Sequence, residues 1–181
     1  MGGRAVDLEL GTMKKKLIII SGPMGVGKTT ICDTLYRHLY ESCWIEGDAF
    51  WRTNPFISNE EETEFTIDNI TYIINRLLNK KNIKYIVFDW VIHTEKIMDE
   101  IIKRINKDNL EVYKITLYCT EEELLKRNMR DIEDGKRDST SIRRGRGIIS
   151  AYEKMNTIKI DTTSKEISEV VHEIYNIVNQ Y

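Results

Sequence analysis

LIIISGPMGVGKTT, residues 17–30, is the stretch that decides how this 181-residue chain folds. Four apolar residues lead into Ser21, and glycines and a proline then break the strand pattern before a lysine and two threonines. Residues 22–29 have the G-x-x-x-x-G-K-T spacing of a phosphate-binding loop, or P-loop. A strand-like run precedes the loop and a helical pattern follows it, which is the structural context that the motif requires. The stretch therefore predicts a strand, a P-loop and a helix.

Each residue type in the loop has a physical role. Glycines let backbone N–H groups turn toward a polyphosphate without side chains in the way, and the following helix directs its positive N-terminal end at the same phosphates. We expect Lys28 to place its charge at the β- and γ-phosphates and Thr29 to ligate Mg²⁺ through its hydroxyl. The alternative is an ordinary strand-to-helix turn that happens to hold a lysine. The loop residues expected to bind ATP are Gly22, Met24, Gly25, Val26, Gly27, Lys28, Thr29 and Thr30.

The composition is that of an ordinary globular chain, with 41% apolar and 31% charged residues. The net charge of −2 predicts no bulk attraction to nucleic acid or to an anionic membrane. Neither a membrane-length apolar run nor a signal-peptide pattern is visible, so we expect a cytoplasmic protein. The three cysteines are widely spaced, which favours reduced thiols, and the three histidines suggest no zinc site. Residues 1–12 lack periodicity, and we treat them as an expression leader or a disordered tail.

Residues 13–181 are predicted to form one domain of the α/β class. Short β-rich runs alternate with helical patterns, as expected for a parallel sheet with helices on both faces. Thr120 with Glu123, and Thr163 with Glu166, have the spacing of capping boxes and predict two later helix starts. The strand-like runs are Leu17–Ser21, Cys43–Glu46, Tyr85–Asp89, Tyr113–Cys119 and Thr157–Asp161.

The run YIVFDW, residues 85–90, supplies a second element of the expected site. Asp89 ends an apolar strand, where a carboxylate beside the P-loop can hold Mg²⁺ directly or through water. The alternative is a strand-ending aspartate that caps the following turn. Thr29 and Asp89 are therefore the expected metal-binding residues, and ATP and Mg²⁺ the expected cofactors.

Several motifs, taken in their order along the chain, resemble those of the small P-loop kinases. They are IIISGPMGVGKTT, WIEGD, VFDW, LYCTEEELLKRNMRD and IKIDTT, within residues 18–163. This family includes gluconate kinase, shikimate kinase, adenylate-kinase-like enzymes and chloramphenicol phosphotransferase. The resemblance implies a three-layer α/β/α fold with a five-stranded parallel sheet in the order 2-3-1-4-5. It also implies an arginine-bearing LID, covering residues 127–147 of this chain, that closes over ATP.

The residues at the start of this LID support a charged helix. Leu125, Met129 and Ile132 are spaced as a buried stripe, and Arg127 and Arg130 share another face. Positioned arginines can stabilise the charge that spreads over a transferred phosphoryl group, and Arg127 is also expected to bind ATP. The alternative is a solvated helix whose arginines only form i,i+4 ion pairs. If the helix continues, Arg137 falls near the stripe. Beyond it, serines and glycines surround Arg143, Arg144 and Arg146, a composition suited to a moving arm.

The segment WIEGDAFWRTNPF, residues 44–56, lies where such kinases usually begin to contact the phosphoryl acceptor. We expect Asp48 to orient or deprotonate the attacking hydroxyl; the alternative is a helix N-cap. A phosphorylated acceptor normally requires two or more arginines, whereas only Arg52 and Arg76 lie between Asp48 and Trp90. An acceptor with at most one negative charge and a ring or apolar face is therefore expected, although the aromatic residues here also suit packing beneath the loop. The expected acceptor-binding residues are Asp48, Trp51, Arg52, Trp90 and His93.

The predicted activity is ATP- and Mg²⁺-dependent transfer of a γ-phosphoryl group to a hydroxyl of a sugar, nucleoside or antibiotic-like molecule. The catalytic residues in this prediction are Lys28, Asp48, Arg127 and Arg130. The alternatives are a nucleoside monophosphate kinase, a polynucleotide 5′-kinase and a regulatory module that binds ATP without a kinase reaction. The absence of an N-K-x-D guanine-reading motif tilts the nucleotide toward ATP rather than GTP. The expected partner is a small-molecule acceptor, with no membrane and with nucleic acid disfavoured, and the oligomeric state is open.

Overall fold

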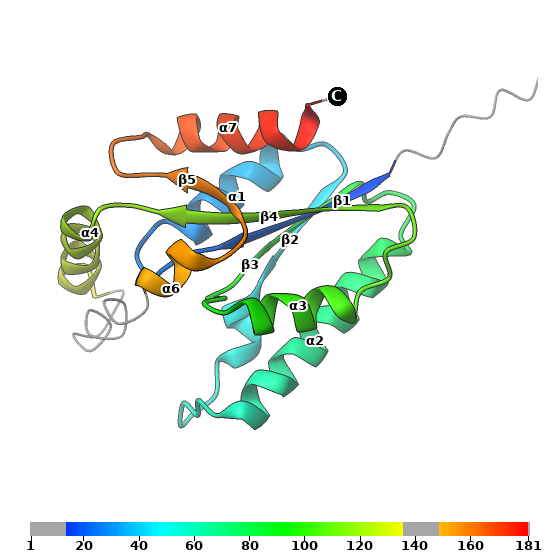
Figure 1. Cartoon of the computed structure of the whole chain (residues 1–181), viewed down its shortest axis with the longest axis horizontal. Coiled ribbons are helices and arrows are strands. Elements are labelled where there is room, and N and C mark those ends of the chain that lie inside the picture. Colours follow the sequence, from blue (N-terminus) through cyan, green and yellow to red (C-terminus); the bar gives the residue numbers. More distant parts are fainter. Residues whose placement is uncertain (1–13, 136–148, 181) are drawn as a thin grey trace, which may run out of the picture.

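The computed structural model describes residues 14–135 and 149–180. They form a sheet of five parallel strands in the order β2-β3-β1-β4-β5, which confirms the predicted fold class and strand order (Figure 1). The strands are β1 Lys15–Ser21, β2 Ser42–Glu46, β3 Tyr85–Asp89, β4 Leu110–Tyr118 and β5 Ile158–Asp161.

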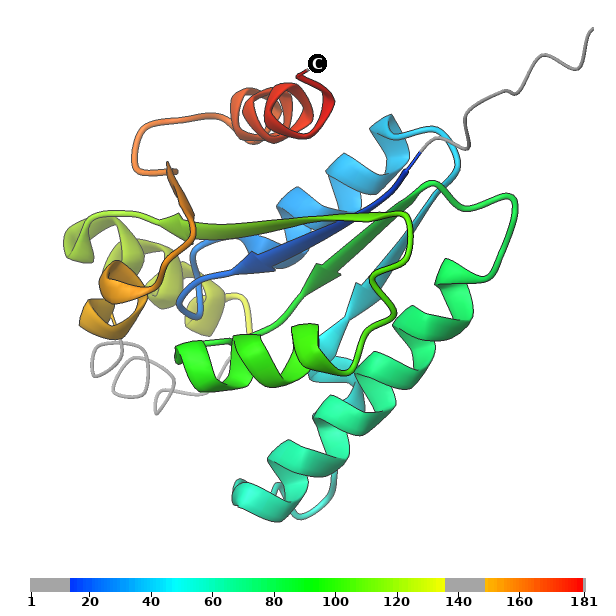
Figure 2. The same cartoon turned by 45° about the vertical axis from the view of Figure 1, so that its right-hand side comes forward.

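Helices cover both faces of this sheet. In Figures 1 and 2, α1 and α7 lie on one face, and α2 and α3 lie on the other. Helix α4 follows the carboxyl end of β4, and a short 3₁₀ helix, η1, follows β2. The helices are α1 Lys28–His38, η1 Gly47–Trp51, α2 Glu60–Leu78, α3 Glu95–Lys103, α4 Glu121–Glu133, α6 Ile149–Lys154 and α7 Ile167–Asn179.

The apolar run of β1 is continuous because the strand is covered on both faces. Leu17 and Ile19 pack into the core beneath α2 and α3, whereas Ile18 and Ile20 pack into the core beneath α1 and α7. All four side chains are fully buried. Successive side chains of β1 thus point to opposite faces of the sheet and contribute to both cores, as expected for a central strand of a parallel sheet.

Parallel pairing brings the carboxyl ends of the strands to one edge of the sheet. Asp89 of β3 lies opposite Ile20 of β1 and opposite Glu46 of β2. On the other side of β1, Ser21 lies opposite Thr116 of β4. The P-loop therefore leaves the middle of the sheet next to the end of β3, in the crevice where open α/β sheets bind their ligands.

The buried face of α4 differs from the predicted one. Leu124 and Asn128 are buried, whereas Met129 is 50% exposed and Leu125 and Ile132 are only partly covered. The prediction of a buried stripe of these last three residues was wrong, because a polar side chain takes the buried position. The Asn128 side chain packs against the P-loop, and this contact turns the Leu124–Asn128 face inward.

The two predicted helix starts have different outcomes. Thr120 is the N-cap of α4 and its hydroxyl accepts a hydrogen bond from the backbone N–H of Glu123, as predicted. The predicted start at Thr163 was wrong: α7 begins at Ile167, after a capping box formed by Glu166 and Glu169. Thr163 instead donates its hydroxyl to Asp161 Oδ1 at 2.6 Å, so that its side chain closes the end of β5.

Parts of the sequence predictions fall outside the described residues. Residues 1–12 do so, as do Arg137, Arg143, Arg144 and Arg146, so most of the predicted LID is not described. Within the described ranges, every helix is too short or too polar to cross a membrane.

Truncating one buried and one exposed apolar side chain of α4 should distinguish the two faces of the helix. We expect Leu124→Ala to lower the free energy of unfolding by about 2–4 kcal/mol, because it removes a core side chain. Met129→Ala serves as the control and should change this free energy by less than about 0.5 kcal/mol. Urea denaturation of both variants measures the difference, and equal losses would contradict the observed helix orientation.

Candidate active site

A cavity of about 640 Å³ opens above the P-loop. It is bounded by the P-loop and the start of α1, by α4, and by the segment that joins β5 to α7. Gly22 and Asp89 do not line this cavity. Both lie at the same edge of the sheet, since Asp89 pairs with Ile20, two residues before Gly22. The predicted site residues that line the cavity are Met24, Gly25, Val26, Gly27, Lys28, Thr29, Thr30, Asp48, Arg127 and Arg130.

Lys28 is held against the loop that it follows. Its Nζ donates to the carbonyl oxygens of Gly22 and Pro23 at 2.8 and 3.1 Å, and the residue is only 8% exposed. Because α1 begins at Lys28 and its first residues line this cavity, the positive end of the helix dipole also lies there. The arrangement suits an anion, with one ammonium group and a helix N-terminus converging on the same space.

Gly25 is required by packing as well as by backbone conformation. Its φ angle is +89°, and a Cβ there would lie 2.6 Å from Asn128 Oδ1. Asn128 of α4 donates Nδ2 to the carbonyl oxygens of Met24 and Leu124 at 3.3 and 3.0 Å. Sequence reasoning missed Asn128, whose only signal was its place four residues after Leu124 on one helix face.

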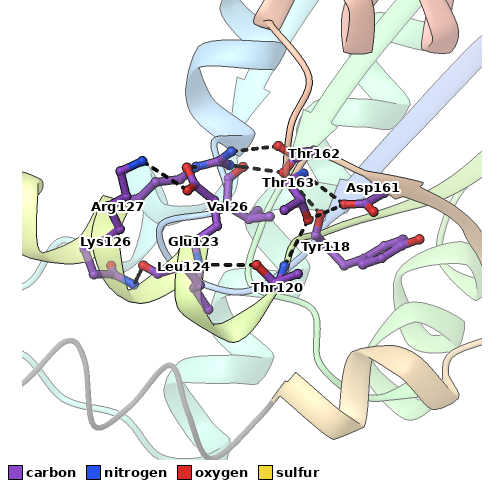
Figure 3. A network of polar contacts seen from close by, with 11 residues as sticks. Val26, Tyr118, Thr120, Glu123, Leu124, Lys126, Arg127, Asp161, Thr162 and Thr163 are labelled. Atoms are coloured by element: carbon purple, nitrogen blue, oxygen red, sulfur yellow. Dashed lines mark hydrogen bonds and ion pairs between the residues drawn. The ribbon is translucent and has the colours of Figure 1, made fainter.

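Arg127 joins three segments around the cavity, as Figure 3 shows. Its Nε donates to Glu123 Oε1 at 2.9 Å within α4. Its Nη1 donates to the Val26 carbonyl oxygen at 3.2 Å, and its Nη2 donates to the Thr162 carbonyl oxygen at 2.7 Å. Arg127 therefore positions α4 against the P-loop and the end of β5. The predicted contacts of Arg127 with ATP and with transferred charge stay predictions, as does the role of the exposed Arg130.

Asp89 is a buried carboxylate at the end of β3. It is 3% exposed and accepts a hydrogen bond from Trp44 Nε1 at 2.7 Å. Burial raises its pKa to about 6, an effect that the Trp44 hydrogen bond and the Lys28 charge oppose and that the charges of Asp48 and Glu46 reinforce. A carboxylate kept from water in this way gains from a nearby cation.

The donors around the P-loop fit Mg²⁺ bound together with phosphate. No group of three or more histidine, cysteine, aspartate or glutamate side chains within the described ranges is placed to hold a metal alone. Mg²⁺ in phosphate sites normally takes one or two protein oxygens and completes its shell with phosphate oxygens and water. The Thr29 hydroxyl and the Asp89 carboxylate are suitable oxygens of this kind.

Asp48 lies on η1, between the P-loop cavity and the segment that leads to α2. The alternative of an N-cap is excluded, since Glu46 occupies that position and Asp48 lies within the helix. Gly47 packs so closely on Trp90 that a Cβ would lie 2.6 Å from Trp90 Cγ. This contact sets η1 against the end of β3, and the exposed Asp48 lines the P-loop cavity.

A second cavity, of about 780 Å³, lies between η1, α2 and α3. Three of the predicted acceptor-binding residues line it: Trp51, Trp90 and His93. The same aromatic residues also pack together, with the Trp51 and Trp90 ring centroids 5.5 Å apart, so they serve both as core and as wall. Arg52 does not line this cavity, because it pairs with Glu46 at 2.7 Å and is largely exposed. Val91 lines both cavities.

Comparisons with known proteins agree with this architecture. A family model described as an AAA domain matches residues 18–146. A search of curated proteins found no match.

Solved structures share the fold at low identity. A tunicamycin resistance protein from Deinococcus radiodurans is 19% identical, with a TM-score of 0.69 over 93% of this chain and 98% of that one. An APS kinase from Mycobacterium tuberculosis is 14% identical, with a TM-score of 0.66 over 92% and 99%. A gluconokinase from Sinorhizobium meliloti is 15% identical, with a TM-score of 0.63 over 89% of each chain. At such identities the likeness establishes the fold, which is that of small P-loop kinases.

The burial of Asp89 makes the stability of the protein depend on pH. Its pKa is raised in the folded state, so ionisation of the buried carboxyl lowers the stability of the fold. This loss of stability is absent at low pH and grows as the pH rises from about 4 to about 6. We expect Asp89→Asn, without nucleotide, to exceed the wild type in unfolding free energy at pH 7 by at most about 3 kcal/mol. The gap should close toward pH 4. Urea denaturation across this range, with the exposed Asp99→Asn as control, measures it; a gap that does not vary with pH contradicts the assignment.

Proposed function

Because the chain belongs to the AAA domain family of P-loop NTPases, we propose that it is a kinase that transfers the γ-phosphoryl group of ATP to a hydroxyl of a small molecule. The observation that carries the proposal is the pairing of two cavities at one edge of the sheet. One contains the P-loop, the other has aromatic walls, and Val91 lines both. A site of this form holds a nucleotide and a second substrate side by side, which phosphoryl transfer requires.

The nucleotide half of the site binds and orients the triphosphate. Lys28, the loop N–H groups and the N-terminus of α1 hold the phosphates. The Thr29 hydroxyl and the Asp89 carboxylate would hold Mg²⁺, which would neutralise charge on the phosphate oxygens. Support for ATP comes from the similar APS kinase, whose structure is a complex with AMPPNP and APS.

The acceptor hydroxyl reacts at the junction of the two cavities. Its oxygen forms a bond to the γ-phosphorus while the bond from that phosphorus to the β,γ-bridging oxygen breaks, and ADP leaves. The hydroxyl proton passes to the Asp48 carboxylate, which lines the P-loop cavity. Arg130 lines the same cavity and stabilises charge on the transferred group, while Arg127 keeps α4 against the loop.

The arginines within residues 14–135 and 149–180 support a non-phosphorylated acceptor. Neither Arg52 nor Arg76 lines the aromatic cavity. Arg104 lies at the far end of α3 and is paired with Glu64, Asp68 and Glu100 at 2.6 to 3.2 Å. A nucleoside monophosphate would therefore meet no arginine among the described residues that line this cavity.

The direct test is ADP release from Mg·ATP with a panel of sugars, amino sugars, sugar acids, nucleosides and nucleoside monophosphates. We expect stimulation by at least one non-phosphorylated class. Lys28→Ala should lower this stimulated rate by about 100-fold or more, since it removes the phosphate-binding cation. Its circular dichroism spectrum should match that of the wild type. The proposal is contradicted if no compound raises ADP release above the blank without acceptor, or if only monophosphates do.

Asp48→Asn separates chemistry from nucleotide binding. The amide keeps the size of the side chain but cannot take a proton, so we expect kcat to fall about 100-fold or more. The Kd of Mg·ATP, measured by isothermal titration calorimetry, should change less than about threefold, because the phosphates are held by the P-loop. Parallel losses in kcat and ATP affinity would assign Asp48 to metal binding instead.

A further inference from the structure

The aromatic cavity has an acidic rim. One face of the first two turns of α2 lines it, and this face carries Glu60, Thr63, Glu64 and Ile67 at the i, i+3, i+4, i+7 spacing. Glu61 lines it as well. The opposite rim is the first turn and a half of α3, which contributes Lys96 and Glu100. Carboxylates therefore outnumber permanent cations among the described residues that line the cavity.

Two of these carboxylates already have a cation. Arg104 forms ion pairs with Glu64 at 2.6 Å and with Glu100 at 3.2 Å. Glu60 and Glu61 form no ion pair within the described parts of the chain. The excess negative charge of the rim therefore comes from these two side chains at the start of α2.

The N-terminal position of these acids does not explain why they line the cavity. Carboxylates in a first turn are favoured by the helix dipole wherever they point. Glu62 shares this benefit, yet it does not line the cavity. Glu62 is therefore a control for the effect of the helix dipole, since its charge lies in the same turn but outside the cavity wall.

The wall next to the acidic rim also favours a cation. The indole of Trp51 is fixed by a hydrogen bond from its Nε1 to the Ile57 carbonyl oxygen at 3.0 Å. Its ring packs on Trp90 and on Phe56, with centroid distances of 5.5 and 5.8 Å. An indole face attracts an ammonium group, and a fixed one loses little freedom on binding.

Trp51 also connects this cavity to the reaction centre. It lies three residues after Asp48 in η1, and residues three apart in a 3₁₀ helix lie one above the other. A ligand against Trp51 is thus close to the carboxylate that faces the P-loop cavity.

We propose that the acceptor is a hydroxylated amine, such as an amino sugar or aminocyclitol, whose ammonium group binds between Glu60, Glu61 and Trp51. This inference rests on the proposed function. The ammonium group orients the molecule and does not react, while one of its hydroxyls reaches Asp48 and accepts the phosphoryl group.

Matched compounds test the charge requirement directly. We would compare glucosamine with N-acetylglucosamine, glucose and gluconate, and kanamycin with its N-acetylated derivative, by calorimetric binding and by ADP release. The free amines should bind at least roughly tenfold more tightly than their acetylated partners. This preference should weaken at high ionic strength, because the two carboxylates are exposed. Equal or tighter binding of the neutral or anionic members, or no binding of any amine, overturns the inference.

Variants of α2 assign the effect to the rim. Glu60→Gln combined with Glu61→Gln should weaken amine binding about three- to tenfold and leave the neutral partner unchanged. Glu62→Gln, in the same turn, should change neither value. Loss of amine preference in the Glu62→Gln variant alone, or its survival in the double variant, contradicts the assignment.

The outcomes separate this inference from the proposed function. Turnover of neutral sugars but not of amines would leave a kinase and overturn the amine assignment. Amine binding that depends on Glu60 and Glu61 without ADP release would support the cavity assignment and overturn the kinase.

Discussion

Strand β1 pairs in parallel with β3 on one side and with β4 on the other, and this pairing positions the P-loop. It places Ile20 beside Asp89 and Ser21 beside Thr116, so the P-loop leaves the sheet where neighbouring strands also end. Both faces of β1 are covered by helices, which makes this central position energetically favourable for a strand with a continuous apolar run. Every segment that the proposed reaction uses departs from the same edge.

Side chains of helix α4 hold the P-loop in place through hydrogen bonds to its backbone. Arg127 and Asn128 donate to the carbonyl oxygens of Val26 and Met24, so adjacent residues of one helix bind two points of the loop. Arg127 reaches Thr162 as well and thereby includes the end of β5. A loop fixed before its ligand arrives requires little reorganisation when phosphate binds, which is the condition for effective electrostatic stabilisation. The same contacts explain why α4 buries Leu124 and the polar Asn128, and not the predicted stripe of Leu125, Met129 and Ile132.

Buried charge at Asp89 illustrates how a site can oppose stability. Removal from water disfavours its ionised form, and the Trp44 hydrogen bond and the Lys28 charge only partly compensate. An apolar residue at the end of β3 would complete the core more favourably. The presence of a carboxylate there is consistent with a cation-binding role, since active sites commonly sacrifice stability for a polar group in the required place.

The P-loop, the α/β class and the ends of β1 and β3 can be predicted from the sequence, because their signals are local: glycine spacing, apolar runs and strand-ending polar residues. Resemblance to the small P-loop kinases supplied the strand order that the structure confirms. The start of α7 at Ile167 is also a local feature, set by the capping box of Glu166 and Glu169, which the choice of Thr163 missed. The folded chain, by contrast, set which face of α4 is buried, because Asn128 there packs on Met24 of the P-loop. It also brought Glu60 and Trp90 to one cavity. Such features depend on contacts between residues far apart in the chain, and periodicity within a single segment carries no information about them.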